Sequence, residues 1–178
     1  MGEDTAFVGL DVHKETIAVA VAEDRRGGEV RYLGEIANTR EAMRKLVTKL
    51  LKAHATLRFC YEAGPCGYGL HRQLTEMGHD CVLVAPSMTP SRPGDRVKTD
   101  RRDAVLLARL HRAGELTAVW VPDEGHEAMR DLVRARTAAM EGLRRARQQL
   151  TGFLLRHDRV FRAGCNWTKK HRVWLATL

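Results

Sequence analysis

Cysteine is scarce in this chain of 178 residues, and no two of its four cysteines form a C-x-x-C pair. Their irregular spacing argues against a zinc site or a disulfide framework and indicates a reducing, cytoplasmic environment. No apolar run approaches the roughly 18 residues that a membrane-spanning helix needs. The first residues are acidic and lead into an apolar segment, which is not the pattern of a signal peptide. We therefore expect a cytoplasmic protein that has no membrane partner.

Acidic residues are also under-represented, because 30 Lys and Arg stand against 22 Asp and Glu and give a formal net charge of +8. The two signs are mixed up to about residue 85, and arginine dominates from Arg92 to Arg172. Such an excess is typical of a protein with a polyanionic partner, most simply nucleic acid. Aromatic residues make up only 6% of the chain and form no obvious stacking platform for single strands.

The hydrophobic pattern predicts strands and helices in a mixed order. With 44% hydrophobic residues, the chain can form a core, and its length fits one domain, or one domain with an appendage. Three closely spaced strands, expected to form an antiparallel meander, are followed by helix, strand, helix and strand, which indicates an α/β sheet of mixed direction. Asn38 or Thr39 begins the first helix, and Asn38 with Glu41 resembles a capping box. The predicted strands are 6–12, 16–22, 30–36, 57–62 and 81–85, and the predicted helices end near Leu51, Met77 and Ala113.

The second half of the chain contains a loop and a long helix. Residues 86–98 hold three of the five prolines and are predicted to form a basic loop without regular structure. We divide the chain into a first domain at 1–118, a long basic helix at 124–160, and the start of a further region at 161–178. An apolar seam interrupted by Arg136 runs along the helix, which either packs on the domain or forms an intermolecular coiled coil. The seam consists of Met129, Leu132, Ala139, Leu143, Ala146, Leu150 and Phe153.

Four acidic residues occupy positions where they are candidate metal ligands. Asp11 lies inside an apolar strand, where a charge is costly unless it is paired or bound to metal. Glu62 ends the fourth strand, and Asp100 and Asp103 share one face of a helix. Carboxylates that converge at one edge of a sheet can hold divalent cations such as Mg²⁺ or Mn²⁺. Taken singly, Glu62 is also explained as a surface residue, Asp100 as a helix N-cap, and Asp103 as an acid in the first helical turn.

Basic residues near these acids are candidate phosphate contacts. His13 and Lys14 follow Asp11 at an expected hairpin tip, where exposure to solvent explains them and contact with a phosphate is the alternative. Arg101 and Arg102 either hold phosphates or balance the neighbouring aspartates. The predicted contacts to nucleic acid are Arg92, Arg96, Lys98, Arg101, Arg102, Arg144, Arg145 and Arg147.

Three sequence blocks resemble a known family. Residues 8–14 (VGLDVHK), 61–67 (YEAGPCG) and 98–104 (KTDRRDA) are similar, in order and spacing, to the three acidic blocks of DEDD transposases. These are bacterial insertion-sequence recombinases related to Piv-type DNA invertases. The resemblance extends over essentially the whole chain, including the tail at 167–175.

The resemblance implies a RuvC-like catalytic domain with a ribonuclease-H-type fold at 1–118, in which Asp11, Glu62, Asp100 and Asp103 bind Mg²⁺ or Mn²⁺. It also implies DNA as a partner, a structured guide RNA in some members, and dimers or larger oligomers joined through the helical arm. Family members continue into a second domain with a nucleophilic serine. This chain ends at Leu178, and Ser87 and Ser91 match no such motif, so we expect 161–178 to begin a region that is missing here.

Three hypotheses follow for the function. The first is a transposase domain that cleaves or exchanges DNA strands with divalent metal during transposition. The second is a non-catalytic module of the same recombinase that binds nucleic acid and dimerises. The third, an actin-like or sugar-kinase ATPase, is disfavoured because Val12-His13-Lys14 follows Asp11 where such enzymes place glycine.

Overall fold

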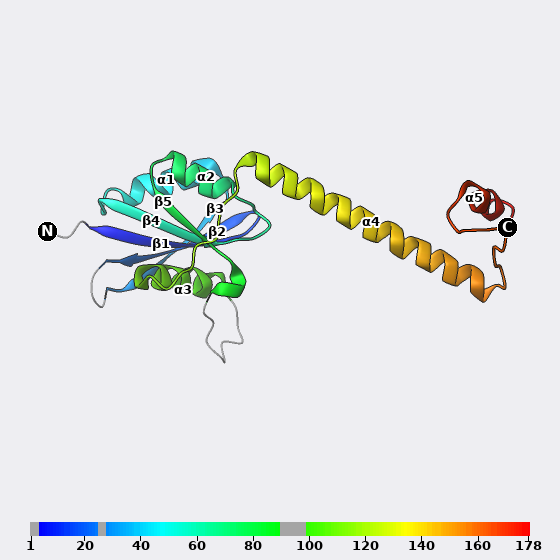
Figure 1. Cartoon of the computed structure of the whole chain (residues 1–178). Coiled ribbons are helices and arrows are strands. Elements are labelled where there is room, and N and C mark those ends of the chain that lie inside the picture. The colour runs from blue at the N-terminus through cyan, green and yellow to red at the C-terminus, as the bar shows by residue number, and fades with distance from the viewer. Residues whose placement is uncertain (1–3, 25–27, 90–98) are drawn as a thin grey trace. The chain divides into compact units, whose positions relative to one another are not determined.

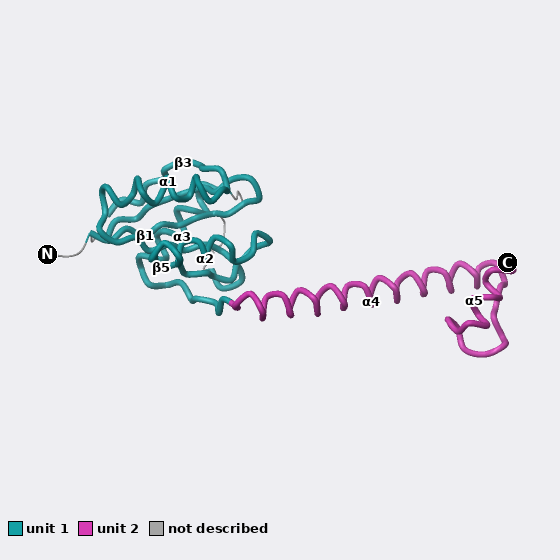
Figure 2. Tube along the Cα trace, turned by 90° about the horizontal axis from the view of Figure 1, so that it is seen from above, with its two compact units in different colours: residues 1–121 teal, residues 122–178 magenta. Residues whose placement is uncertain are grey.

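The structure is a computed structural model that describes residues 4–24, 28–89 and 99–178. It separates into two compact units, Met1–Val121 and Pro122–Leu178, which are coloured separately in Figure 2. Each unit is considered by itself below.

A five-stranded mixed sheet forms the centre of the first unit. Its strands are β1 (Thr5–Val12), β2 (Thr16–Glu23), β3 (Val30–Ala37), β4 (Thr56–Glu62) and β5 (Asp80–Val84), in the order β3-β2-β1-β4-β5. The first three strands pair antiparallel, as the meander predicted, and β4 and β5 run parallel to β1. The strand order places β1 at the centre of the sheet.

Helices cover both faces of this sheet (Figure 1). α1 (Arg40–Leu50) and α2 (Gly69–Glu76) lie over one face, where the larger core forms around Leu10, Met43 and Phe59. α3 (Asp100–Ala113) lies over the other face, against a smaller cluster rich in alanine. A mixed α/β sheet flanked by helices and followed by a long helix was predicted, and this architecture is confirmed.

Three local predictions need correction. Thr39 caps α1 by accepting from the backbone N–H of Ala42, so Asn38 and Glu41 do not form the capping box. Asn38 instead donates its side-chain amide to the carbonyl of His13 at 2.7 Å. Thr99, rather than Asp100, is the N-cap of α3. The segment predicted as an irregular loop begins with a short 3₁₀ helix, Pro86–Met88, because proline suits the first position of a helical turn.

The second unit consists of a long helix and a short C-terminal one. α4 (Glu124–Arg156) has 33 residues, contains no proline, and begins at the cap Asp123. α5 (Lys169–Leu175) follows, and its His171 is buried among the rings of Phe161, Trp167 and Trp174. Among the described residues, no helix has the length and apolar character needed to cross a membrane.

His111 on α3 is a titratable group inside the first unit. Its side chain is 8% exposed and meets the ring of Phe7 edge-on, with the ring centroids 5.2 Å apart. Burial lowers the pKa of His111 to about 4, and the positive charge of Arg58 adds to this effect while Asp80 opposes it. Within the described part of the chain its Nε2 atom has no hydrogen-bond partner. His111 is therefore neutral in the folded protein at pH 7.

We predict that acidification destabilises the fold through His111. The unfolded residue binds a proton near pH 6.5, whereas the folded residue binds one only near pH 4, so protons favour unfolding between these values. The free energy of unfolding should fall by up to about 3 kcal/mol across this window. His111→Gln should flatten the dependence, as measured by urea unfolding at pH 6.5, 5.5 and 4.5. Equal pH dependence in both proteins would contradict the prediction.

Candidate metal centre at the end of β1

α3 lies directly on the backbone of β1 at Gly9. A Cβ atom at this position would lie 2.3 Å from the carbonyl oxygen of Ala104 and 2.4 Å from the backbone nitrogen of Ala108. Both distances are far below van der Waals contact, and both involve backbone atoms that cannot turn aside. Apart from Phe7, the buried side chains of the cluster at this crossing are all alanines, namely Ala18, Ala20, Ala22, Ala104 and Ala108. The close packing therefore depends on a residue without a side chain at position 9.

This crossing brings the first residue of α3 to the end of β1. Phe7 on β1 meets His111 near the C-terminal end of α3, so the helix runs antiparallel to the strand. Four helical residues separate Ala104 from Asp100, a rise of about 6 Å. Two strand residues separate Gly9 from Asp11, about 6.6 Å. The two distances match, and Asp100 reaches Asp11.

Asp11, His13 and Asp100 form a compact cluster. The Nε2 atom of His13 lies 3.2 Å from Asp11 Oδ2 and 3.4 Å from Asp100 Oδ1. One ligand atom from each of the three residues lies within 4.8 Å of the other two, so the group could hold a metal ion. The side chain of Asp11 is 21% exposed, and those of His13 and Asp100 are about half exposed. A hydrated cation can therefore reach the cluster from solvent.

The backbone of the β1–β2 turn holds His13 in place. The backbone N–H of His13 donates to the carbonyl of Thr16 at 2.9 Å. Its own carbonyl accepts from the side-chain amide of Asn38 at 2.7 Å. These two bonds tie the residue to β2 and to the segment after β3, so its position is defined by three parts of the sheet.

Electrostatics at the cluster favour a positive charge. Burial raises the pKa of Asp11, and the carboxylates of Asp103 and Asp100 raise it further, while His13 opposes both effects. The pKa of His13 is raised chiefly by the negative charge of Asp11, with a further contribution from Asp100. Asp11 thus carries its charge at a cost that a nearby cation would relieve.

The other two predicted acids, Glu62 and Asp103, are outside the three-residue group. Gly9 pairs with Cys60 across β1 and β4, and the Cys60 thiol donates to the carbonyl of Leu107 on α3. Because side chains alternate along a strand, Glu62 faces the same side of the sheet as Cys60 and Asp11. Asp103 lies one turn along α3 and is near enough to raise the pKa of Asp11. The structure brings Asp11 and Asp100 together, with Asp103 near enough to act on Asp11, and puts Glu62 on the same face of the sheet.

His13 is the residue that the sequence interpretation underestimated. Solvent exposure at a hairpin tip was the favoured explanation, yet its ring contacts both aspartates. The available signal was its spacing of two residues from Asp11, which places both on one face of an extended segment.

The predicted nucleic-acid residues are found in several places. The guanidinium of Arg101 lies 5.5 Å from the ring centre of Tyr32. Arg102 is exposed on the first turn of α3, and Arg144 and Arg145 are exposed on α4. Three of the predicted contacts lie outside the described residues, namely Arg92, Arg96 and Lys98.

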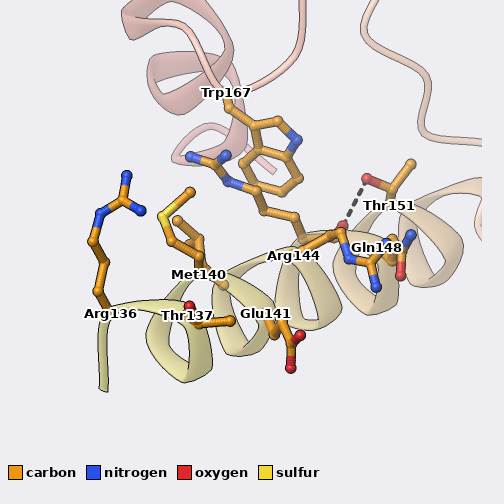
Figure 3. Close-up of a pocket in the computed structure, with 10 residues that line it drawn as sticks. Arg136, Thr137, Met140, Glu141, Arg144, Gln148, Thr151 and Trp167 are labelled. Carbon is orange, nitrogen blue, oxygen red and sulfur yellow. Dashed lines mark hydrogen bonds between the residues drawn. The ribbon is translucent and has the colours of Figure 1, made fainter. Parts of the chain in front are cut away.

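A pocket lies on α4 beneath Trp167. It has a volume of about 790 Å³ and is lined by apolar and basic side chains of α4. Figure 3 shows Trp167 reaching down toward the face of the helix that carries Met140 and Arg144. The guanidinium of Arg147 lies 5.2 Å from the centre of the Trp167 ring. This contact stabilises the C-terminal segment against α4. It also means that Arg147, which was predicted to contact nucleic acid, packs against a tryptophan in this structure.

Comparison with known proteins identifies the family. A family model for transposases of the IS110 DEDD type matches residues 8–157. The chain belongs to the DEDD transposase family. It is 56% identical over 170 residues to y4qE of Sinorhizobium fredii, which is named as a transposase, covering 96% of this chain and 44% of that protein. It is 38% identical over 174 residues to the transposase for insertion sequence element IS1533 of Leptospira borgpetersenii, covering 97% of this chain and 50% of that protein.

The DEDD transposase chain thus spans about half the length of the curated relatives it matches. Similar solved structures include RuvC of Thermus thermophilus, with a TM-score of 0.43 at 12% identity, covering 64% of this chain and 99% of that one. The large terminase nuclease of the thermophilic phage G20c has a TM-score of 0.39 at 12% identity, covering 65% of this chain and 58% of that one.

Gly9→Ala should displace α3 and weaken the cluster. The added methyl group forces the helix away from β1, and such overpacking costs about 1–3 kcal/mol of unfolding free energy. Mn²⁺ binding, measured by calorimetry, should weaken because Asp100 moves with α3. Gly69→Ala on α2 is the matched control, because a Cβ there meets nothing within 4 Å. If both variants retained the parent stability and Mn²⁺ affinity, the crossing at Gly9 would not position the site.

Proposed function

We propose that this chain is the metal-dependent, DNA-processing part of a DEDD transposase, in which Asp11, Glu62, Asp100 and Asp103 bind Mg²⁺ or Mn²⁺. Its reaction would be cleavage or exchange of DNA strands during transposition. The observation that carries the proposal is the meeting of Asp11 and Asp100, from distant parts of the sequence, at the end of the central strand. Membership of the DEDD transposase family supports the same assignment.

The residues present fit such a metal. Their ligand atoms are mainly carboxylate oxygens, which hard divalent cations prefer. Burial, with smaller contributions from the carboxylates of Asp103 and Asp100, raises the pKa of Asp11, and a bound cation would stabilise its charged form. In the proposed site the partly buried carboxylate of Asp11, at the end of β1, would fix the position of the ion. Asp100 and Asp103 would be contributed by α3, and Glu62 by β4. When bound, divalent metal would activate an attacking oxygen and stabilise the leaving oxygen of a phosphodiester.

The partners of the whole protein are part of this proposal. DNA is the substrate that the family names imply, since one relative is the transposase of an insertion sequence element. A structured guide RNA remains a prediction from the family resemblance alone.

A second candidate, a non-catalytic module that binds nucleic acid and dimerises, has its own support. The second unit carries twelve Lys and Arg against six Asp and Glu, whereas the first unit is nearly balanced at eighteen against sixteen. Exposed Arg144 and Arg145 lie off the apolar seam of α4, where they could contact phosphates while the seam is covered. This module and the catalytic domain can coexist in one chain.

We further propose that α4 pairs with α4 of a second copy. Met129, Leu143 and Leu150 recur at multiples of seven residues, the period of a coiled coil, although Arg136 interrupts the series. Their exposed fractions are 62%, 45% and 37%, and Leu132 and Phe153 beside them are 66% and 50% exposed. So many apolar side chains on one face of a helix favour burial against a partner.

Asp11→Asn should abolish the proposed metal site, because it removes a ligand charge without changing the shape of the side chain. We expect Mn²⁺ and Mg²⁺ affinity, measured by calorimetry, to fall at least about tenfold, and metal-dependent nicking of duplex DNA to be lost. Asp24→Asn, an exposed acid at the end of β2, is the matched control and should change neither.

The same proteins separate the two candidate functions. Salt-sensitive DNA binding that survives in Asp11→Asn, with no metal-dependent nicking by the parent chain, would favour the non-catalytic module. Unchanged metal affinity in Asp11→Asn would contradict the proposed metal site itself.

Leu143→Asp should prevent pairing through α4, because it places a charge in the middle of the seam. We expect the chain to sediment as a dimer or larger oligomer and the variant as a monomer, measured by analytical ultracentrifugation. Ala138→Asp adds the same charge to α4 at a position outside the seam and should leave the oligomer intact. A monomeric parent chain at all concentrations, or equal dissociation in both variants, would refute pairing through the seam.

A further inference from the structure

The ring of His13 lies where a ligand of the metal site would lie. Its Nε2 atom is 3.2 Å from one oxygen of Asp11 and 3.4 Å from one oxygen of Asp100. Bonds of about 2.1 Å to a small divalent cation place neighbouring ligand atoms roughly 3.0–3.4 Å apart, in octahedral or tetrahedral geometry. The two contacts of Nε2 therefore already have the spacing of neighbouring ligands around one ion, and ligand atoms of all three residues lie within 4.8 Å of one another.

We propose that His13 is a direct nitrogen ligand of this site and that it shifts the metal preference from Mg²⁺ toward first-row transition ions such as Mn²⁺. The inference rests on the proposed function, because it takes Asp11 and Asp100 as metal ligands. It goes further by adding an imidazole to a set expected to contain only carboxylates.

The chemistry of the ligand supports this preference. Carboxylates and water suit both Mg²⁺ and Mn²⁺, and imidazole is favoured most by later first-row ions; Mn²⁺, itself a transition ion, still accepts an imidazole nitrogen more readily than Mg²⁺ does. One imidazole beside two carboxylates therefore adds more to the affinity for Mn²⁺ than to that for Mg²⁺. The neutral tautomer with its proton on Nδ1 presents the Nε2 lone pair that such a bond requires.

The surroundings of His13 allow its ring to exchange contacts with the aspartates for a bond to a metal ion. Its backbone is held by Thr16 and Asn38, so the side chain starts from a fixed point. The side chain itself is 51% exposed, so Nε2 can replace its contacts with the carboxylates by a contact with an ion without rearranging the core. Asp11 and Asp100 are then free to bind the same ion.

The experiment compares the untagged parent chain with His13→Ala, His13→Gln and Lys14→Ala. Calorimetry gives the Mn²⁺ and Mg²⁺ affinities, and pulsed electron paramagnetic resonance of bound Mn²⁺ detects a directly bonded imidazole nitrogen. Lys14 is the matched control because it is the next residue of the same turn and its side chain is 91% exposed. His13→Gln keeps a hydrogen-bond donor but has no imidazole.

We expect a nitrogen signal in the parent chain and in Lys14→Ala, and none in either His13 variant. Mn²⁺ affinity should fall at least about tenfold in both His13 variants, and Mg²⁺ affinity by a smaller factor. No nitrogen signal in the parent, or full Mn²⁺ affinity in His13→Gln, would show that His13 only hydrogen-bonds to the aspartates and would overturn the proposal. Metal binding that His13→Ala leaves intact but Asp11→Asn abolishes would refute the ligand role while sparing the proposed function.

Discussion

The close approach of α3 to β1 at Gly9 is the constraint on which the candidate site depends. Asp11 and Asp100 are far apart in sequence, and neither makes a site alone. They meet because a helix backbone rests on a strand backbone with no side chain between them. The alanines of β2 and α3 extend the same flat contact. Packing of the smallest residues in the domain thus determines the distance between its most chemically important ones.

The two units differ in their charge balance and in the surfaces that they expose. The first has nearly balanced charge and concentrates negative side chains at one edge of its sheet, where burial keeps Asp11 costly to ionise. The second carries most of the positive excess and displays an apolar seam along α4. The acidic cluster of the first unit and the basic, apolar-seamed helix of the second are the features on which the proposed metal binding, nucleic-acid binding and pairing rest.

Much of the fold was predictable from the sequence because the signals are local. Short apolar runs separated by turn residues predicted the strands, and the spacing of Met43, Leu46, Val47 and Leu50 predicted α1. The choice of cap was less predictable, since Asn38 and Thr39 are both good caps and only a tertiary bond to His13 decides between them.

Part of the candidate site was also predictable, because some of its signals are local in the sequence. Asp11 stood out because a charge inside an apolar strand needs a partner, and the family blocks pointed to Glu62, Asp100 and Asp103. The contact of His13 with Asp100 was hidden because it depends on how closely α3 approaches β1, a distance set by tertiary packing. The most direct test is a crystal structure of the chain with Mn²⁺, using anomalous scattering to locate the ion. We predict one strong peak bonded to Asp11, His13 and Asp100, with Glu62 and Asp103 turned toward it. A peak elsewhere, with the three side chains still contacting one another, would contradict this prediction.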